Sequence, residues 1–164
     1  MAKAKARDLD VYIDLLETVA EWLHSRELSP LPKRIYRDSK DYYADSIARG
    51  EVYLAYMEKS LAGALRLVPN DGIVWQLVPV DTALYLENLL VSRVWSHLGL
   101  GREMLTWAER QAAMRGKTHL RLDCFAENTF LRAYYEGLGY AEMGQVSALY
   151  PFGTLRLQRY EKPV

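Results

Sequence analysis

A short segment, Gly99-Leu100-Gly101, is the part of this sequence whose residue types point most directly to a chemical role. It follows Ala83 to Val91, whose branched and aromatic residues predict a strand, and it begins a predicted helix that runs to Arg115. The first N–H groups of a helix lack intrahelical partners, and the helix dipole favours an anion beside them. Glycines leave those N–H groups accessible. The segment therefore predicts a binding site for a phosphate ester or a diphosphate.

Two other classes of protein that use a strand, a glycine loop and a helix to bind nucleotides do not match this sequence. A dinucleotide-binding fold requires a third glycine, and Met104 stands at that position. A nucleoside-triphosphate loop ends in Gly-Lys-Ser/Thr, whereas this one reads Gly101-Arg102-Glu103. An ordinary tight start of a helix, with no ligand, remains open on the loop alone.

Histidine and cysteine offer little further chemistry. His24, His97 and His119 lack the spacing of metal ligands, so no metal site is predicted. The single cysteine, Cys124, excludes an internal disulfide and suits the reducing cytoplasm. We expect a packed thiol there rather than a nucleophile.

Length and composition limit the number of domains and the classes of binding partner that the chain can have. The 164 residues are 50% hydrophobic, which fits one domain spanning residues 1–164. Lys+Arg and Asp+Glu are equal at 21 each, so no bulk charge draws the chain to nucleic acid or to an anionic membrane. No apolar run approaches about 18 residues and no signal peptide is recognisable. These features predict a soluble cytoplasmic protein, with the oligomeric state left open and a homodimer among the options.

Periodicity and turn residues predict the elements that position the glycine segment. Apolar spacing predicts helices at Asp8–Arg26, capped by Asp8, and from Asp38 or Ser39 to Arg49. Met1–Arg7 is expected to be a solvated tail rather than an edge strand, and Leu28–Arg37 a loop because of its two prolines. The remaining expected elements are a hairpin of Glu51–Met57 and Leu61–Val68, a ragged strand or loop at Ile73–Val80, a strand at Thr118–Cys124, a helix at Asn128–Leu138, and a hairpin of Tyr140–Val146 and Thr154–Glu161.

Two separate patterns resemble the GNAT superfamily of acyl-CoA-dependent N-acyltransferases. The first is Leu89-Leu90-Val91 followed by Ser96-His97-Leu98-Gly99-Leu100-Gly101. The second is Asn128, then Tyr134-Tyr135-Glu136, then Gly139-Tyr140. The chain departs from the family at Ser96, where Arg or Gln is usual, and at His97, which replaces the first glycine. Loss of the charged contact should weaken cofactor binding by ~1–2 kcal/mol, and Arg102 could partly replace it.

The resemblance implies an α/β fold, a single GNAT-like domain. Its central sheet is mixed and mostly antiparallel, with about six or seven strands flanked by about four helices. It also implies acetyl-CoA (coenzyme A) as cofactor, with its pantetheine arm pairing like a guest strand. The residues expected to contact the coenzyme are Leu89, Leu90, Val91, His97, Leu98, Gly99, Leu100, Gly101, Arg102, Asn128 and Tyr135. Asn128 could equally cap a helix.

Two residues are expected to carry the catalytic chemistry. The resemblance implies that Tyr135 protonates the departing thiolate, with Tyr134 as the packed neighbour. Glu87 is the candidate general base, because strand alternation would put it on one face with Tyr85, Leu89 and Val91. A solvent-facing glutamate remains the alternative to that role.

The acceptor is expected to be a primary amine of a small molecule or of a peptide or protein. Aromatic and acidic residues predicted to line its site are Trp22, Tyr36, Tyr85 and Glu87, although such aromatics also serve as core. Transfer is expected to be direct, within a ternary complex. The alternative is a non-catalytic acyl-CoA-binding or sensor domain. A transferase acting on charged tRNA is disfavoured by the neutral net charge.

Overall fold

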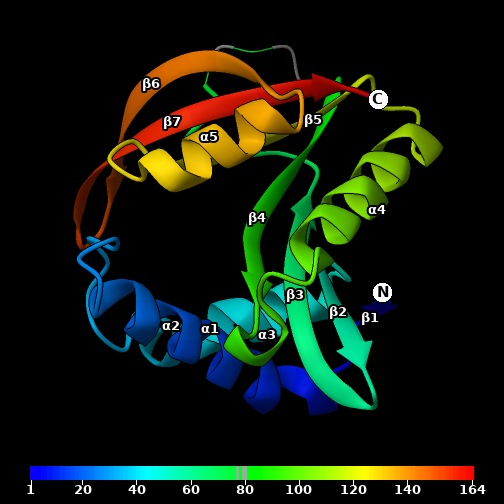
Figure 1. Ribbon diagram of the computed structural model, residues 1–164, viewed down its shortest axis with the longest axis vertical. Coiled ribbons are helices and arrows are strands. Elements are labelled where there is room, and N and C mark those ends of the chain that lie inside the picture. Colours follow the sequence, from blue (N-terminus) through cyan, green and yellow to red (C-terminus); the bar gives the residue numbers. More distant parts are fainter. Residues whose placement is uncertain (77, 79–80) are drawn as a thin grey trace. The chain divides into compact units, whose positions relative to one another are not determined.

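The computed structural model describes residues 1–76, 78 and 81–164 (Figure 1). The helices are α1 (Leu9–His24), α2 (Ile35–Asp38), α3 (Lys40–Ala48), α4 (Leu100–Met114) and α5 (Thr129–Gly137), with short 3-10 helices η1 (Ala6–Asp8) and η2 (Arg93–Trp95). The strands are β1 (Ala2–Lys3), β2 (Val52–Met57), β3 (Ser60–Val68), β4 (Ala83–Val91), β5 (His119–Phe125), β6 (Ala141–Tyr150) and β7 (Gly153–Pro163). In the described residues, no helix combines the length and apolar character needed to cross a bilayer.

The strands form a seven-stranded sheet in the order β1-β2-β3-β4-β5-β7-β6. The β4–β5 pair is parallel, whereas β1–β2, β2–β3, β5–β7 and β6–β7 are antiparallel. The predicted mixed, mostly antiparallel α/β sheet is therefore confirmed. The described residues hold five α-helices rather than about four, because the four-residue α2 lies across the end of the predicted loop Leu28–Arg37.

The chain forms two compact units. The N-terminal unit comprises residues 1–67 and 88–105, and the C-terminal unit comprises residues 68–87 and 106–164. Strand β4 and helix α4 each contribute residues to both units. The expectation of one domain over residues 1–164 stays a prediction.

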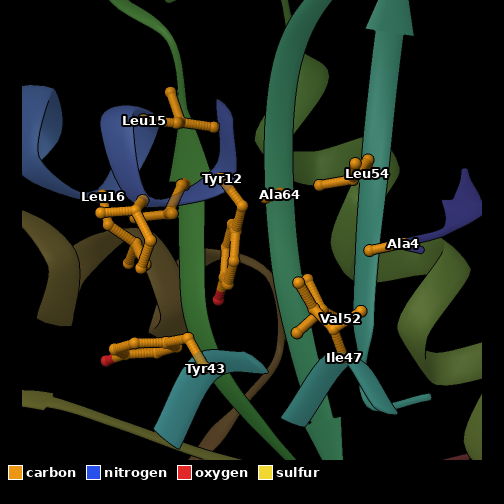
Figure 2. Close-up of a cluster of buried hydrophobic side chains, with 11 residues drawn as sticks. Ala4, Tyr12, Leu15, Leu16, Tyr43, Ile47, Val52, Leu54 and Ala64 are labelled. Carbon is orange, nitrogen blue, oxygen red and sulfur yellow. The ribbon is translucent and has the colours of Figure 1, made fainter. Parts of the chain in front are cut away.

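The core of the N-terminal unit forms where the apolar stripe of α1 meets α3 and strands β2 and β3 (Figure 2). Tyr12 and Leu16 of α1 are fully buried, and the ring of Tyr12 lies edge-on to Tyr43 of α3 at 5.8 Å between centroids. This packing confirms the helical stripe predicted from the spacing of apolar residues. Burying aromatic side chains of this size supplies much of the stabilisation of the unit.

The N-terminus differs from the prediction. Instead of a solvated tail, Ala2 and Lys3 form the edge strand β1, paired antiparallel with Leu54 and Tyr53 of β2. Ala4 follows with its side chain buried. The predicted tail was wrong because β2 has an open edge whose backbone N–H and C=O groups need partners. Backbone pairing does not depend on side-chain identity, so the N-terminal segment can supply those partners.

The predicted helix caps also differ. Asp8 occupies the N-cap of α1, but its side chain accepts the N–H of Lys5 at 2.8 Å instead of a helix N–H. Ser39 occupies the N-cap of α3 without a side-chain capping bond. The segment Ile73–Val80 is expected to be a ragged strand or a loop. Residues Ile73 to Gln76 form a turn, which agrees with the loop, and residues 77, 79 and 80 lie outside the described residues.

Gly63 marks a close approach inside the N-terminal unit. A Cβ atom at this position would lie 2.7 Å from the carbonyl oxygen of Leu90 and 2.9 Å from Sδ of Met104. Both distances are shorter than side-chain packing allows. The missing side chain therefore lets β3 lie directly against the end of β4 and the first turn of α4, the two segments that flank the glycine loop.

The C-terminal unit is built around the long hairpin of β6 and β7, with α5 lying along it (Figure 1). The hairpin is longer than predicted, because pairing extends from Ala141–Glu161 to the turn at Tyr150–Gly153. The ring of Tyr135 on α5 packs against Tyr160 of β7 at 5.8 Å and against Tyr140 at 6.0 Å. Tyr160 also donates its hydroxyl to Glu136 at 2.8 Å, which fixes α5 on the hairpin.

Candidate functional site

The glycine loop lies between β4 and α4 in the N-terminal unit. It begins with η2, where the hydroxyl of Ser96 donates to the carbonyl of Arg93 at 2.7 Å. It ends at Gly99, whose carbonyl accepts the N–H of Glu103 at 3.1 Å and so forms the first hydrogen bond of α4. Gly99 has φ 82°, the left-handed conformation that glycine adopts without steric penalty.

The backbone N–H groups of this loop are available to an anion. Among the residues that the structure describes, those of residues 97–102 donate to no backbone or side-chain acceptor. A Cβ built on Gly99 meets no atom within 4 Å, so the space beside these donors is open. The helix dipole adds a favourable potential at this end of α4. The donor set therefore fits a diphosphate, as the sequence predicted.

His97 stands where the resemblance expects a glycine, and the structure shows why a glycine suits that position. Its φ is 65°, in the left-handed region that side chains with a Cβ rarely adopt. Histidine, like asparagine, tolerates this region better than branched residues do. The loop thus keeps its backbone course at a modest conformational cost.

Strand β4 is not regularly extended. Asn88 has φ 50°, in the left-handed region. A left-handed residue inside a strand breaks the alternation of side chains, as in a β-bulge. The argument that put Glu87 on one face with Leu89 and Val91 therefore does not hold across Asn88.

Glu87 instead lies at the end of the parallel ladder between β4 and β5. The ladder pairs Ala83–Leu86 with His119–Leu122, and the next residues along the two strands are Glu87 and Asp123. Burial raises the pKa of Asp123 to about 8, and the charges of Asp71 and Glu87 act in the same direction. Ionisation of Asp123 is therefore disfavoured while Glu87 is charged. Sequence reasoning missed Asp123, because an aspartate within a strand carries no local signal of what lies beside it.

Tyr135 is held inside the C-terminal unit by α5. Its side chain is 4% exposed, while that of Tyr134 is only partly buried. The prediction that Tyr134 is the packed residue of the pair was therefore wrong, because it is the ring of Tyr135 that packs against Tyr140 and Tyr160. Burial, with neighbouring Cys124 and Asp123, raises the pKa of Tyr135 well above its usual range. Its hydroxyl consequently stays protonated at physiological pH.

Cys124 and Asn128 have structural surroundings. Cys124 is buried, and burial raises the pKa of its thiol to about 12, which confirms the packed thiol. Asn128 is 3% exposed, and its side chain accepts the N–H of Leu131 at 3.0 Å. The helix cap considered for Asn128 is therefore confirmed, and its contact with a coenzyme stays a prediction.

The residues expected to line the acceptor site are engaged in different ways. Two guanidinium groups stack on the ring of Trp22. The guanidinium carbon lies 3.9 Å from the ring centroid for Arg93 and 5.0 Å for Arg26. Tyr85 is 2% exposed and its hydroxyl accepts a hydrogen bond from Arg121 at 3.0 Å. Burial and the charge of Glu17 raise the pKa of Tyr36 to about 12.

The predicted site residues fall into two groups. Trp22, Tyr36, the strand end Leu89–Val91 and the loop residues His97–Arg102 belong to the N-terminal unit. Tyr85, Glu87, Asn128 and Tyr135 belong to the C-terminal unit. Within the C-terminal unit, the charge of Glu87 raises the pKa of Asp123, and the charge of Asp123 raises the pKa of Tyr135. Their roles in a reaction stay predictions.

Comparison with known proteins gives consistent matches. The sequence profile described as the acetyltransferase (GNAT) family matches residues 16–140. The chain is 31% identical over 141 residues to a Bacillus subtilis protein named uncharacterized N-acetyltransferase YesJ, which covers 84% of this chain and 78% of that protein.

Solved structures of acetyltransferases share the fold. A GNAT-family acetyltransferase from Listeria monocytogenes superimposes with a TM-score of 0.80 at 25% identity, covering 99% of this chain and 92% of that one. The Salmonella typhimurium protein yncA, a putative acetyltransferase solved with its cofactor acetyl-CoA, gives a TM-score of 0.66 at 14% identity, covering 98% and 90%.

Proposed function

We infer the reaction from this premise: the chain belongs to the acetyltransferase (GNAT) family. It is an N-acetyltransferase. We propose that it moves the acetyl group of acetyl-CoA to a primary amine, carried by a small molecule or by a peptide or protein. The single cysteine with a buried thiol suits a reducing cytoplasm, where we place the reaction.

The observation that carries this proposal is the open donor set at the start of α4. The N–H groups of residues 97–102 would bind the diphosphate of coenzyme A, and Arg102 would add a charge. The end of β4, Leu89 to Val91, would offer backbone groups to the pantetheine arm. When bound, acetyl-CoA supplies a thioester carbonyl that an amine can attack and a thiolate that can leave.

Two groups of this chain would handle the protons. Tyr135 would give its hydroxyl proton to the sulfur as the thiolate departs, a role supported by its place in the Tyr134-Tyr135-Glu136 pattern that resembles the family. Glu87 would take the proton that the amine loses as its nitrogen bonds to the carbonyl carbon. Asp123, whose pKa of about 8 lies near the working pH, supports Glu87 by sharing that proton.

Direct transfer between the two substrates is favoured over a covalent acyl-enzyme. An acyl-enzyme would need an activated nucleophile, and the only cysteine of the chain is buried with a raised pKa. Direct transfer predicts intersecting lines in a two-substrate initial-rate analysis, whereas an acyl-enzyme predicts parallel lines.

The test is thiol release from acetyl-CoA across a panel of amines, alongside calorimetric titration with coenzyme A. Turnover with at least one amine, together with coenzyme binding that is lost when Gly99 is replaced by valine, supports the proposal. Gly153→Val, at a glycine in the β6–β7 turn, is the matched control and should leave coenzyme binding unchanged. Coenzyme binding without turnover on any amine would favour a sensor domain instead.

A further inference from the structure

A row of four acidic residues runs along one side of α1. Asp10, Asp14, Glu17 and Glu21 are spaced four, three and four residues apart, which places them on neighbouring turns of one helix face. Two of them have cationic partners: Lys40 lies 2.6 Å from Asp10, and Arg37 lies 2.7 Å from Asp14. Along the described chain, Glu17 and Glu21 form no ion pair.

Glu17 is the unusual member of the row. Its side chain is 7% exposed, and among the described residues its one hydrogen bond is to the backbone N–H of Arg37 at 2.9 Å. A carboxylate buried to this extent normally has a cationic partner or several donors, because losing water costs free energy that one N–H does not replace. Glu17 therefore has capacity for a further donor.

The side chain of Glu17 lines a cavity within the N-terminal unit. The cavity has a volume of about 530 Å³ and lies between α1 and the segment that leads into α2. Its lining residues are Glu17, Ala20, Glu21, His24, Ser25, Pro32, Lys33, Arg34 and Ile35. Acidic groups thus come from α1, and the two basic groups, Lys33 and Arg34, come from the facing segment.

His24 holds the facing segment in place. Its ring nitrogens lie 2.9 Å from the carbonyl oxygen of Ala20 on α1 and 2.5 Å from that of Leu31. This link fixes the distance between the acidic and the basic wall, so the cavity is a built feature rather than a gap beside a free loop. Trp22 is not among the residues that line the cavity.

We propose that this cavity binds a small zwitterion, with its ammonium group held by Glu17 and Glu21 and its anionic group held by Lys33 and Arg34. An ammonium group would stand to Glu17 and Glu21 as Lys40 and Arg37 stand to Asp10 and Asp14. The basic wall disfavours a polycation, and the volume accommodates molecules from an amino acid to a dipeptide. The inference concerns binding, so it does not depend on the proposed acetyl transfer.

The experiment is calorimetric titration of the full chain, without coenzyme, with free amino acids, dipeptides, and the matching compounds that lack either the amino or the carboxyl group. The zwitterions should bind, and removal of either charge from the ligand should weaken binding about tenfold or more. Glu17→Gln should do the same, and it keeps the oxygen that accepts the N–H of Arg37. Glu58→Gln, an exposed glutamate in the β2–β3 turn, should leave the affinity unchanged.

Two further variants keep the test decisive if Glu17→Gln disturbs folding. Glu21→Gln and Lys33→Met replace exposed side chains on the acidic and basic walls, and each should weaken binding of the zwitterion. The proposal is overturned if no zwitterion binds at millimolar concentration, if diamines of similar length bind more tightly, or if these variants bind as well as the native chain. Because thiol release is measured separately, failure here leaves the proposed reaction untouched.

Discussion

At the scale of single residues, Tyr135 combines a buried aromatic ring with a hydroxyl that resists ionisation. Tyr135→Phe keeps the ring that packs on Tyr140 and Tyr160 and removes the proton. We expect kcat for acetyl transfer to fall by ~100-fold, because general acid catalysis typically contributes at least that factor. Affinity for coenzyme A, measured by calorimetry, should change little.

Tyr134→Phe is the matched control for that substitution, since it removes a hydroxyl from the adjacent, less buried tyrosine. Its turnover should remain near that of the native enzyme. If Tyr135→Phe retained full turnover across the pH range, Tyr135 would be a packing residue and the acid would have to be sought elsewhere.

Asp123 makes the free energy of unfolding fall as pH rises, whereas a salt-bridged aspartate makes it rise with pH. Its pKa is raised from 3.8 to about 8, so between these values the folded chain holds a proton that the unfolded chain has released. The contribution is therefore fully present below pH 4 and is lost as pH rises through about 8. Asp123→Asn, which keeps the neutral shape, should raise the free energy of unfolding at pH 8 by ~1 kcal/mol or more.

Denaturant unfolding of Asp123→Asn and the native chain at several pH values checks this. The gain should shrink toward pH 4, where both side chains are neutral. Asp38→Asn, at an exposed position on α2, should show no such gain. A gain for Asp123→Asn that stayed constant from pH 4 to 8 would contradict the linkage.

At the scale of elements, the close approach of β3 to β4 sets the position of the strand end before the glycine loop. Gly63→Ala would put a Cβ 2.7 Å from the carbonyl oxygen of Leu90, which is backbone and cannot rotate away. We expect a loss of ~1–3 kcal/mol in the free energy of unfolding. KM for acetyl-CoA should rise as well, because Leu90 belongs to the segment proposed to face the pantetheine arm.

Gly137→Ala is the matched control for Gly63→Ala. A Cβ on Gly137 meets nothing within 4 Å, and the residue lies in helix α5. Alanine should therefore stabilise the chain by up to ~1 kcal/mol, since it has the higher helix propensity. The two substitutions are chemically identical and should shift the melting temperature in opposite directions; a shift of the same sign in both would refute the argument from close approach.

At the scale of the whole molecule, the question is whether the two units unfold together. Strand β4 and helix α4 contribute residues to both units, so neither can lose these elements without disturbing the other. We therefore propose that residues 1–164 behave as one domain and show a single calorimetric transition, with calorimetric and van't Hoff enthalpies equal. Two resolved transitions would contradict this proposal.

Much of the molecule could be predicted from local patterns. The glycine loop, the helix α4 that follows it and the strand β5 all appear where the residues indicated. Periodicity and glycine placement are properties of neighbouring residues, so they can be read without knowing the tertiary contacts. Two motifs in the expected order also sufficed to place the chain in its family.

The sequence by itself determined most of the helices and strands, the glycine loop between β4 and α4 and the acetyltransferase family, because each depends on residues close together in the chain. Tertiary structure alone decided that Asn88 breaks the alternation after Glu87, that Asp123 lies beside Glu87, and that Glu17 is buried against a cavity. Burial and charge proximity depend on segments far apart in the sequence, and a carboxylate looks the same in the sequence whether it is solvated or enclosed.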